Sequence, residues 1–199
     1  IPLFMAGDKQ YFYYANLLME QNSLDVSIMG ENMLETTMFK SAFCGIKPKF
    51  EKAHTYSLST MDKLKMMGFY GKEFLLNPAY INSSILDSLD AFKSYYLINH
   101  KNVNLFDYMM WDENVINDTL LGSYNWEVDP ETDSTWRIGD GTAAFYNYIY
   151  LMVAGFTEND TFRSNQIREG QITRDEGLEF IEKENKPRWN SIQWYCNTI

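Results

Sequence analysis

The chain has 199 residues, of which 45% are hydrophobic and 16% aromatic, so it is long enough to bury a sizeable and bulky core. Its 17 basic and 27 acidic residues give a formal net charge of −10, which argues against a general nucleic-acid or anionic-membrane surface. We therefore expect no nucleic-acid partner, and any phosphate site has to be built locally.

Cysteines and histidines are too few and too scattered to predict a metal site. Cys44 and Cys196 lack metal-ligand spacing, and His54 and His100 are isolated, so we expect reduced thiols in a cytoplasmic protein and no metal ligands. No apolar run is long enough to cross a bilayer. The chain begins at Ile1 without an initiator methionine, which suggests a piece of a longer protein.

The first part of the chain alternates between helical and strand patterns. Residues 9–22 are predicted to form a helix, residues 24–29 a strand, and residues 33–42 a second helix. The loop Gly30-Glu31-Asn32 separates this strand from the second helix. This order is typical of a parallel α/β unit, in which the loop at the carboxyl end of a strand usually binds ligands.

The middle of the chain begins with an irregular connection over residues 43–58, which could act as a lid. A short helix is predicted from Ser59 to about Gly68, and another begins at Ser83 or Ser84. The apolar periodicity of that second helix predicts a buried stripe made by Ile85, Leu89, Phe92 and Tyr96.

The rest of the chain is predicted to be largely helical after a short strand over residues 103–109. Asp112 can cap a helix that stops at Gly122, and residues 125–135 form a polar loop. Helices are expected over residues 143–154, 157–169 and 173–184, the last opened by a capping box, and Pro187 starts a terminal helix. The first of these is expected to point the following side chains inward: Phe145, Ile149, Met152 and Val153.

The segment WRIGDGTAAFYNY, residues 136–148, combines a cation, a carboxylate and a glycine turn at a helix start. Gly139 and Gly141 allow positive φ, and Thr142 is a good N-cap, so free backbone N–H groups could face an anion or nucleotide. The alternative is a glycine turn before a core helix, with Asp140 complementing the helix dipole and Arg137 pairing with a surface carboxylate. From this segment alone, the two interpretations are about equally weighted.

Four blocks in this order resemble the C-terminal portion of the N-acetyl sugar amidotransferases, a branch of the PP-loop ATP pyrophosphatase superfamily. The blocks are IPLFMAGDKQYFYYANLLMEQN with LDVSIMGENMLETT, then NLFDYMMWDENVINDTLLGSYNWE, TWRIGDGTAAFYNY and SNQIREGQITRDEGLEFIEK. The superfamily's Ser-Gly-Gly-x-Asp-Ser loop, which holds the ATP pyrophosphate, is absent from the sequence. The resemblance implies that this loop lies upstream of Ile1; the alternative is a degenerate member without ATP chemistry.

The resemblance implies an α/β fold, namely the C-terminal part of a PP-loop domain of the Rossmann-like, adenine nucleotide alpha hydrolase-like type, with a mostly helical C-terminal region. Residues 1–45 are expected to be the α/β part, residues 46–135 a helical and irregular insertion, and residues 136–199 the helical region. The implied activity is an ATP- and Mg²⁺-dependent amidation of a nucleotide-linked N-acetyl sugar for surface polysaccharide (lipopolysaccharide, O-antigen) biosynthesis.

Ammonia is implied to come from a partner glutaminase subunit or domain, and a homo-oligomer is a further option. Two other functions stay open: an enzyme of amino-sugar metabolism related to glucosamine-6-phosphate synthase, and a non-catalytic interaction module.

The demands of this chemistry select the candidate site residues. Arg137 and Asp140 are the candidate catalytic residues. Arg163 and Arg168 could reach the same cleft, but surface ion pairs with Glu158 or Glu169 are the favoured expectation. The residues expected to bind ATP or the sugar nucleotide are Lys9, Gly30, Glu31, Asn32, Lys40, Gly139, Gly141 and Thr142.

Overall fold

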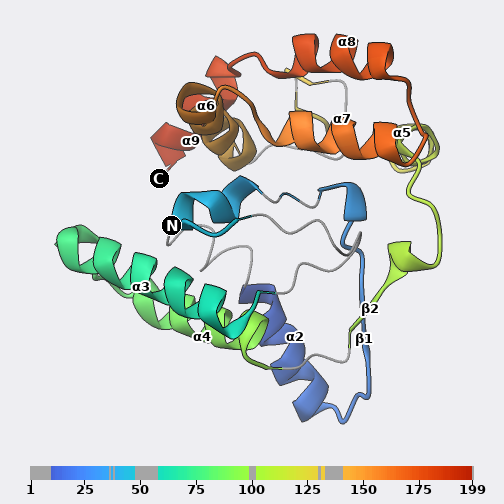
Figure 1. Cartoon of the computed structure of the whole chain (residues 1–199). Coiled ribbons are helices and arrows are strands. Elements are labelled where there is room, and N and C mark those ends of the chain that lie inside the picture. The colour runs from blue at the N-terminus through green and yellow to red at the C-terminus, as the bar shows by residue number, and fades with distance from the viewer. Residues whose placement is uncertain are drawn as a thin grey trace. The chain divides into compact units, whose positions relative to one another are not determined.

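The computed structural model describes residues 10–35, 37, 39–47, 58–98, 102–129, 131–132 and 141–198. This part of the chain is mostly helical, with a small two-stranded parallel sheet (Figure 1). Contacts divide the chain into two compact units: unit 1 consists of Ile1–Glu31 and Met38–Tyr108, and unit 2 of Asn32–Thr37 and Met109–Ile199. This division differs from the three expected segments, whose assignment stays a prediction.

Unit 1 contains helices and one strand pair. Its strands β1 (Ser27–Met29) and β2 (Asn102–Asn104) are parallel, with Met29 opposite Asn104. Parallel strands need a long crossover, and here the crossover carries most of the helices of the unit. The other elements are α2 (Gln10–Gln21), the 3-10 helix η2 (Phe39–Cys44), α3 (Thr60–Leu76), η3 (Pro78–Tyr80), α4 (Ser84–Tyr96) and η4 (Leu105–Asp107).

Both strands are shorter than the sequence predicts. The chain pairs only over three residues on each side, and η4 begins directly after Asn104. Val26, expected inside the first strand, precedes β1 and is exposed. The apolar run 24–29 therefore overestimates the strand, because strand length depends on the partner as well as on local propensity.

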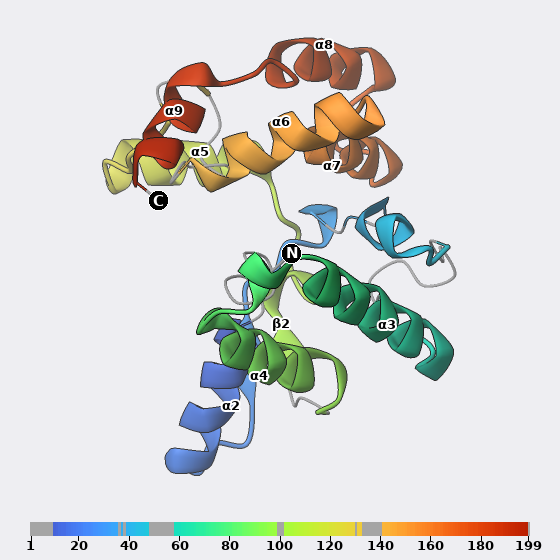
Figure 2. The same ribbon diagram turned by 90° about the vertical axis from the view of Figure 1, so that its left-hand side faces the viewer.

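Helices α2 and α4 lie side by side in both views (Figures 1 and 2) and pack through small side chains of α4. Ser88, Ala91 and Ser94 are buried on this face, where Phe12 of α2 is also buried. The predicted stripe was partly wrong, because Leu89 is 61% exposed. Small residues let two helices approach closely, and apolar periodicity does not register buried serines.

Helix α3 runs through the glycine at which it was predicted to end. Ser59 is its N-cap, as predicted, and the Asp62 N–H donates to the Ser59 hydroxyl. The helix passes Gly68 and ends at Leu76, with Asn77 as its C-cap immediately before Pro78. The terminator is the proline, which cannot continue a helix, rather than the glycine.

The helix predicted over residues 33–42 is not formed as one element. It is replaced by the 3-10 helices η1 (Met33–Glu35) and η2, which belong to different units. The Asn32 side-chain oxygen accepts a hydrogen bond from the Leu34 N–H at 3.0 Å. Such local side-chain bonds favour a tight turn over a regular α-helix.

Unit 2 agrees closely with the predicted helices. Asp112 caps its first helix, and Thr157 and Thr173 each form a capping box, as the local sequence indicated for Asp112 and Thr173. Helix α7 packs against η1 and α8, and α6 packs against α9. The helices are α5 (Glu113–Ser123), α6 (Thr142–Ala154), α7 (Glu158–Arg168), α8 (Arg174–Glu184) and α9 (Trp189–Thr198).

The inward face predicted for α6 was wrong in its C-terminal half. Met152 and Val153 are 62% and 68% exposed, whereas Ala144 is buried near the start of the helix. Helix α6 is apolar nearly all round, so its sequence alone does not tell the packed face from the open one.

Across the described part of the chain, every helix falls short of the length and apolarity that a membrane crossing requires.

Candidate functional site

The structure describes only some of the predicted site residues. Lys9, Arg137, Gly139 and Asp140 lie outside the described residues. The remaining candidates lie in the loop after β1, in η2 and at the start of α6.

The loop after β1 begins in unit 1 with exposed Gly30 and Glu31. The Tyr11 hydroxyl of α2 donates to the Glu31 carboxylate at 2.5 Å. Burial, and then the charge of Glu31, raise the pKa of Tyr95 to about 12. Glu31 is therefore placed among tyrosines on the α2–α4 side of the unit.

Asn32 is the predicted site residue with the most unusual environment. Asn32 is 8% exposed, and its side-chain oxygen accepts a hydrogen bond from the Leu34 N–H. Its Nδ2 group is buried and has no hydrogen-bond partner among the described residues. A buried donor without an acceptor costs about 1–3 kcal/mol, so this N–H pair is a candidate for contact with a ligand or water oxygen.

Lys40 lies in η2 of unit 1 and is half-buried, so it is not a fully solvated surface charge. The start of α6 belongs to unit 2. Unit 1 and unit 2 thus each hold some of the predicted binding residues.

Gly141 has the positive φ that the sequence predicts, at 75°, and serves as the N-cap of α6. Thr142 was predicted to be the cap and is instead the first helical residue. A Cβ atom on Gly141 would lie 2.6 Å from both the Ser191 carbonyl oxygen and the Tyr195 Cβ atom of α9. The close approach that this glycine allows is therefore made to α9.

Arg163 was expected on the surface, paired with Glu158 or Glu169, and this expectation was wrong. Its side chain is 2% exposed and lies between Glu113 of α5 and Glu184 of α8. Nη1 donates to Glu113 Oε2 at 2.5 Å, Nε donates to Glu184 Oε2 at 3.1 Å, and Nη2 donates to Glu184 Oε1. We call this set, Glu113–Arg163–Glu184, the arginine clamp.

The arginine clamp is extended by neighbouring amides and aromatic rings. Arg163 Nη1 also donates to Gln166 Oε1 at 2.7 Å, and its guanidinium lies 4.1 Å from the ring centre of Phe180. Burial lowers the pKa of Arg163, but the hydrogen bonds and charges of the two glutamates outweigh it and raise the pKa. The clamp therefore fastens α5, α7 and α8 together through a permanent cation.

Arg168, the second arginine expected in a surface ion pair, has a different partner. Its Nη1 donates to Asn165 Oδ1 at 2.6 Å, and it forms no ion pair with Glu169 among the described residues. Asn165 Nδ2 in turn donates to the Leu34 carbonyl at 2.8 Å. A continuous chain of hydrogen bonds therefore links Arg168 to the turn that Asn32 caps.

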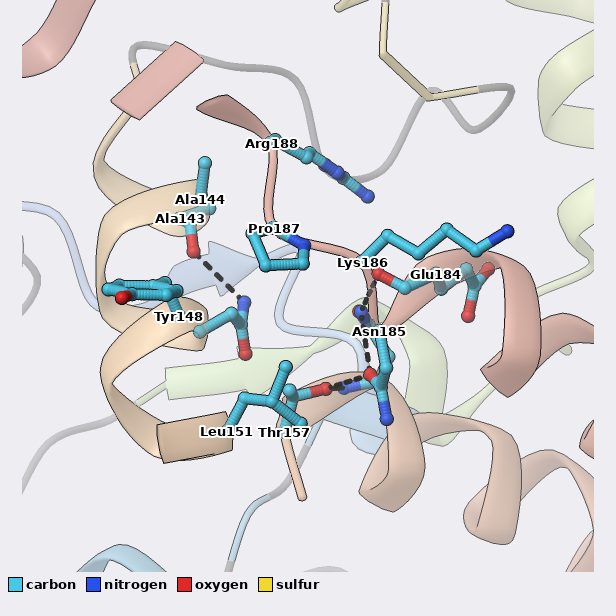
Figure 3. A pocket seen from close by; sticks show the side chains of 12 residues that line it. Ala143, Ala144, Tyr148, Leu151, Thr157, Glu184, Asn185, Lys186, Pro187 and Arg188 are labelled. Carbon is cyan, nitrogen blue, oxygen red and sulfur yellow. Dashed lines mark hydrogen bonds between the residues drawn. The ribbon is translucent and has the colours of Figure 1, made fainter. Parts of the chain in front are cut away.

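A hollow in unit 2 lies where α6, the α6–α7 turn and the α8–α9 linker meet (Figure 3). Asn147, Thr157 and Asn185 supply polar side chains to its wall. The Thr157 hydroxyl donates to Asn185 Oδ1 at 2.5 Å, and Asn147 Nδ2 donates to the Ala143 carbonyl at 3.0 Å. Asn147 Oδ1 accepts from the Glu158 N–H at 3.0 Å.

This hollow is too small to be a substrate site. Its interior offers about 20 Å³, close to the room that one water molecule needs. The side chains of Asn147 and Asn185 already form hydrogen bonds with the backbone and with Thr157. We interpret it as a polar joint between helices.

The Mg²⁺ implied by the family resemblance finds no ligand set in the described part of the chain. No three His, Cys, Asp or Glu side chains come together there in a way that could hold a metal ion. Glu113 and Glu184 do approach each other, but the Arg163 guanidinium already lies between them.

The sequence did not predict the roles of Asn165 and Glu113. Asn165 connects two segments that lie 131 residues apart in the chain, and Glu113 reaches Arg163 across 50 residues. One signal was available for Asn165, because it lies three positions before Arg168 on one helix face.

Comparison of the chain with protein-family models, with curated proteins and with solved structures gives no significant match. The family resemblance therefore rests on the residues quoted above, and the activity that it implies is a proposal.

Proposed function

We propose that this chain is part of an ATP-dependent amidotransferase that acts on a nucleotide-linked N-acetyl sugar. The proposal rests on the four ordered blocks of sequence and on the parallel pairing of β1 with β2. Residues 1–45 would then be the C-terminal α/β part of a PP-loop domain, and the cleft of such a domain lies at the carboxyl ends of its parallel strands.

The observation that carries the proposal is the buried Nδ2 group of Asn32, three residues after β1, which has no acceptor among the described residues. This position follows the carboxyl end of a parallel strand, where ligands bind in open α/β sheets. The group offers N–H donors to an acceptor oxygen, which suits a phosphate or a sugar acetamido carbonyl.

In the proposed reaction, the acetamido carbonyl oxygen attacks the α-phosphorus of ATP and pyrophosphate leaves. Ammonia then adds to the activated carbon, and AMP departs with the former carbonyl oxygen, which leaves an amidine. Ammonia comes from a partner glutaminase, and the product serves surface polysaccharide biosynthesis. Arg137 and Asp140 remain the proposed catalytic residues.

The test is a pyrophosphate-release assay on the intact protein with ATP, Mg²⁺, ammonia and a panel of nucleotide-linked N-acetyl sugars. We expect release that depends on one of the sugars and falls strongly in Arg137→Ala. The proposal is abandoned if a folded protein releases no pyrophosphate with any sugar.

A second candidate, a non-catalytic interaction module, is favoured by exposed apolar side chains on α6 and α9. Met152, Val153, Trp189 and Trp194 are each more than half exposed. Isolated apolar side chains are common on surfaces, but several on two packed helices are typical of a docking face. Light scattering of wild type beside Val153→Asp and Trp194→Asp, together with the pyrophosphate-release assay, separates the candidates: an oligomer that these variants dissociate, in a folded protein without turnover, supports the interaction module.

A further inference from the structure

We propose that Asn32 and Arg168 form a binding subsite for a phosphate group of a nucleotide. The nucleotide part of this statement rests on the proposed function, whereas the phosphate part follows from the donors themselves. Both residues belong to unit 2, in which η1 lies against α7.

The two residues are held by one chain of hydrogen bonds. Asn32 Oδ1 accepts from the Leu34 N–H at 3.0 Å, and the Leu34 carbonyl accepts from Asn165 Nδ2 at 2.8 Å. Asn165 Oδ1 then accepts from Arg168 Nη1 at 2.6 Å. Leu34 is 2% exposed, so the turn that carries Asn32 is fixed on α7 by packing as well.

Asn32 and Arg168, at the two ends of this series of hydrogen bonds, have only donor groups left to offer. Asn32 Nδ2 is buried and has no acceptor among the described residues. Arg168 is exposed, and its groups other than Nη1 make no hydrogen bond within the described part of the chain. An amide N–H group and a guanidinium both suit an anion with several acceptor oxygens, and a planar guanidinium is well suited to phosphate.

The surroundings partly oppose an anion, so the site needs both donors. Glu35 and Glu169 are exposed carboxylates close to it in sequence, and Arg168 lies at the carboxyl end of α7. Two carbonyls in the last turn of α7 are already occupied, since Asn165 O accepts from Glu169 N and Gln166 O from Gln171 N. Solvated carboxylates are screened by salt, which leaves the guanidinium charge as the main local attraction.

The experiment is isothermal titration of the intact protein with inorganic pyrophosphate, ATP and UDP-N-acetylglucosamine. We expect wild type to bind pyrophosphate, and Arg168→Gln to weaken this binding by about tenfold or more, because charge-assisted hydrogen bonds are lost. Arg168→Lys keeps the positive charge but not the planar, forked set of N–H donors, and it is expected to retain part of the affinity. Arg174→Gln, an exposed arginine at the start of α8, is the matched control and should bind as wild type does.

Asn32→Asp tests the other donor. It keeps an oxygen that can accept from the Leu34 N–H and replaces the free N–H groups by a negative charge. We expect it to weaken pyrophosphate binding as well. If this variant does not fold, the affinities of Arg168→Gln and Arg168→Lys decide whether the subsite exists. A loss of affinity for ATP alone assigns the ATP phosphates, and a loss for the sugar nucleotide alone assigns its diphosphate.

Two results would overturn the subsite: no pyrophosphate binding by folded wild type, or equal affinity in wild type and Arg168→Gln. Failure of the proposed function looks different, because pyrophosphate and nucleotide would still bind with dependence on Arg168 while no sugar supports turnover. Turnover that survives Arg168→Gln with an unchanged KM removes the subsite and leaves the function standing.

Discussion

Replacing Arg163 by methionine tests the arginine clamp most sharply. The change removes a cation that is 2% exposed and leaves Glu113 and Glu184, whose side chains are only 16% and 15% exposed, facing each other. At a separation of about 5 Å and an effective dielectric of about 20, two negative charges repel by about 3 kcal/mol. Loss of one partner of a buried pair typically costs about 3–5 kcal/mol, so we expect a loss of this size in the free energy of unfolding.

The expected loss depends on pH in a defined direction. Without Arg163, the two buried carboxylates repel each other, and protonation of either one relieves this repulsion. The variant is therefore destabilised most at neutral pH and regains stability as pH falls.

The assay is urea denaturation at pH 7 and pH 5, with amide hydrogen exchange of α7 as a local probe. The triple variant Glu113→Gln, Arg163→Met, Glu184→Gln should recover most of the loss, because no buried charge remains. Arg174→Met, an exposed arginine, is the matched control and should stay within about 0.5 kcal/mol of wild type. A loss below about 1 kcal/mol, or one that is the same at both pH values, would refute the argument.

Two further predictions concern a glycine and a thiol. Gly141→Ala and Gly155→Ala share the same backbone strain, since φ is 75° and 77°, but only the methyl group added at Gly141 meets neighbouring atoms. Thermal unfolding should therefore show Gly141→Ala to be less stable than Gly155→Ala by about 1–3 kcal/mol. Equal melting temperatures of the two variants would count against the packing of α6 on α9. Burial raises the pKa of the Cys44 thiol, and a hydrogen bond with Tyr70 offsets part of this rise. At pH 8, iodoacetamide should therefore label exposed Cys196 faster than Cys44, as read by peptide mass spectrometry. Tyr70→Phe should slow the labelling of Cys44 further. Equal labelling rates would contradict this assignment.

Local signals in the sequence predicted the helices of unit 2 well. Asp112 and Thr173 cap the helices that follow them, because capping depends on residues only two or three positions apart. The parallel pair was also predicted as strands, although longer than they are. These features are encoded within one turn or one strand.

Features that depend on distant partners could not be predicted in this way. Arg163 looked like a surface residue because its partners, Glu113 and Glu184, are 50 and 21 residues away. The packed face of α4 was misjudged because Ser88 and Ser94 are buried for their small size rather than for hydrophobicity. Among the predicted site residues, Asn32 has a buried free donor that keeps it a candidate.

The most direct test of the proposed function follows one oxygen atom. A nucleotide-linked N-acetyl sugar labelled with oxygen-18 in its acetamido carbonyl is incubated with the intact protein, ATP, Mg²⁺ and ammonia, and the AMP formed is analysed by mass spectrometry. Adenylation of the carbonyl predicts AMP that carries the label, together with an unlabelled amidine. Label that stays in the sugar while ATP is consumed, or no consumption of ATP by the folded protein, would contradict the amidotransferase proposal.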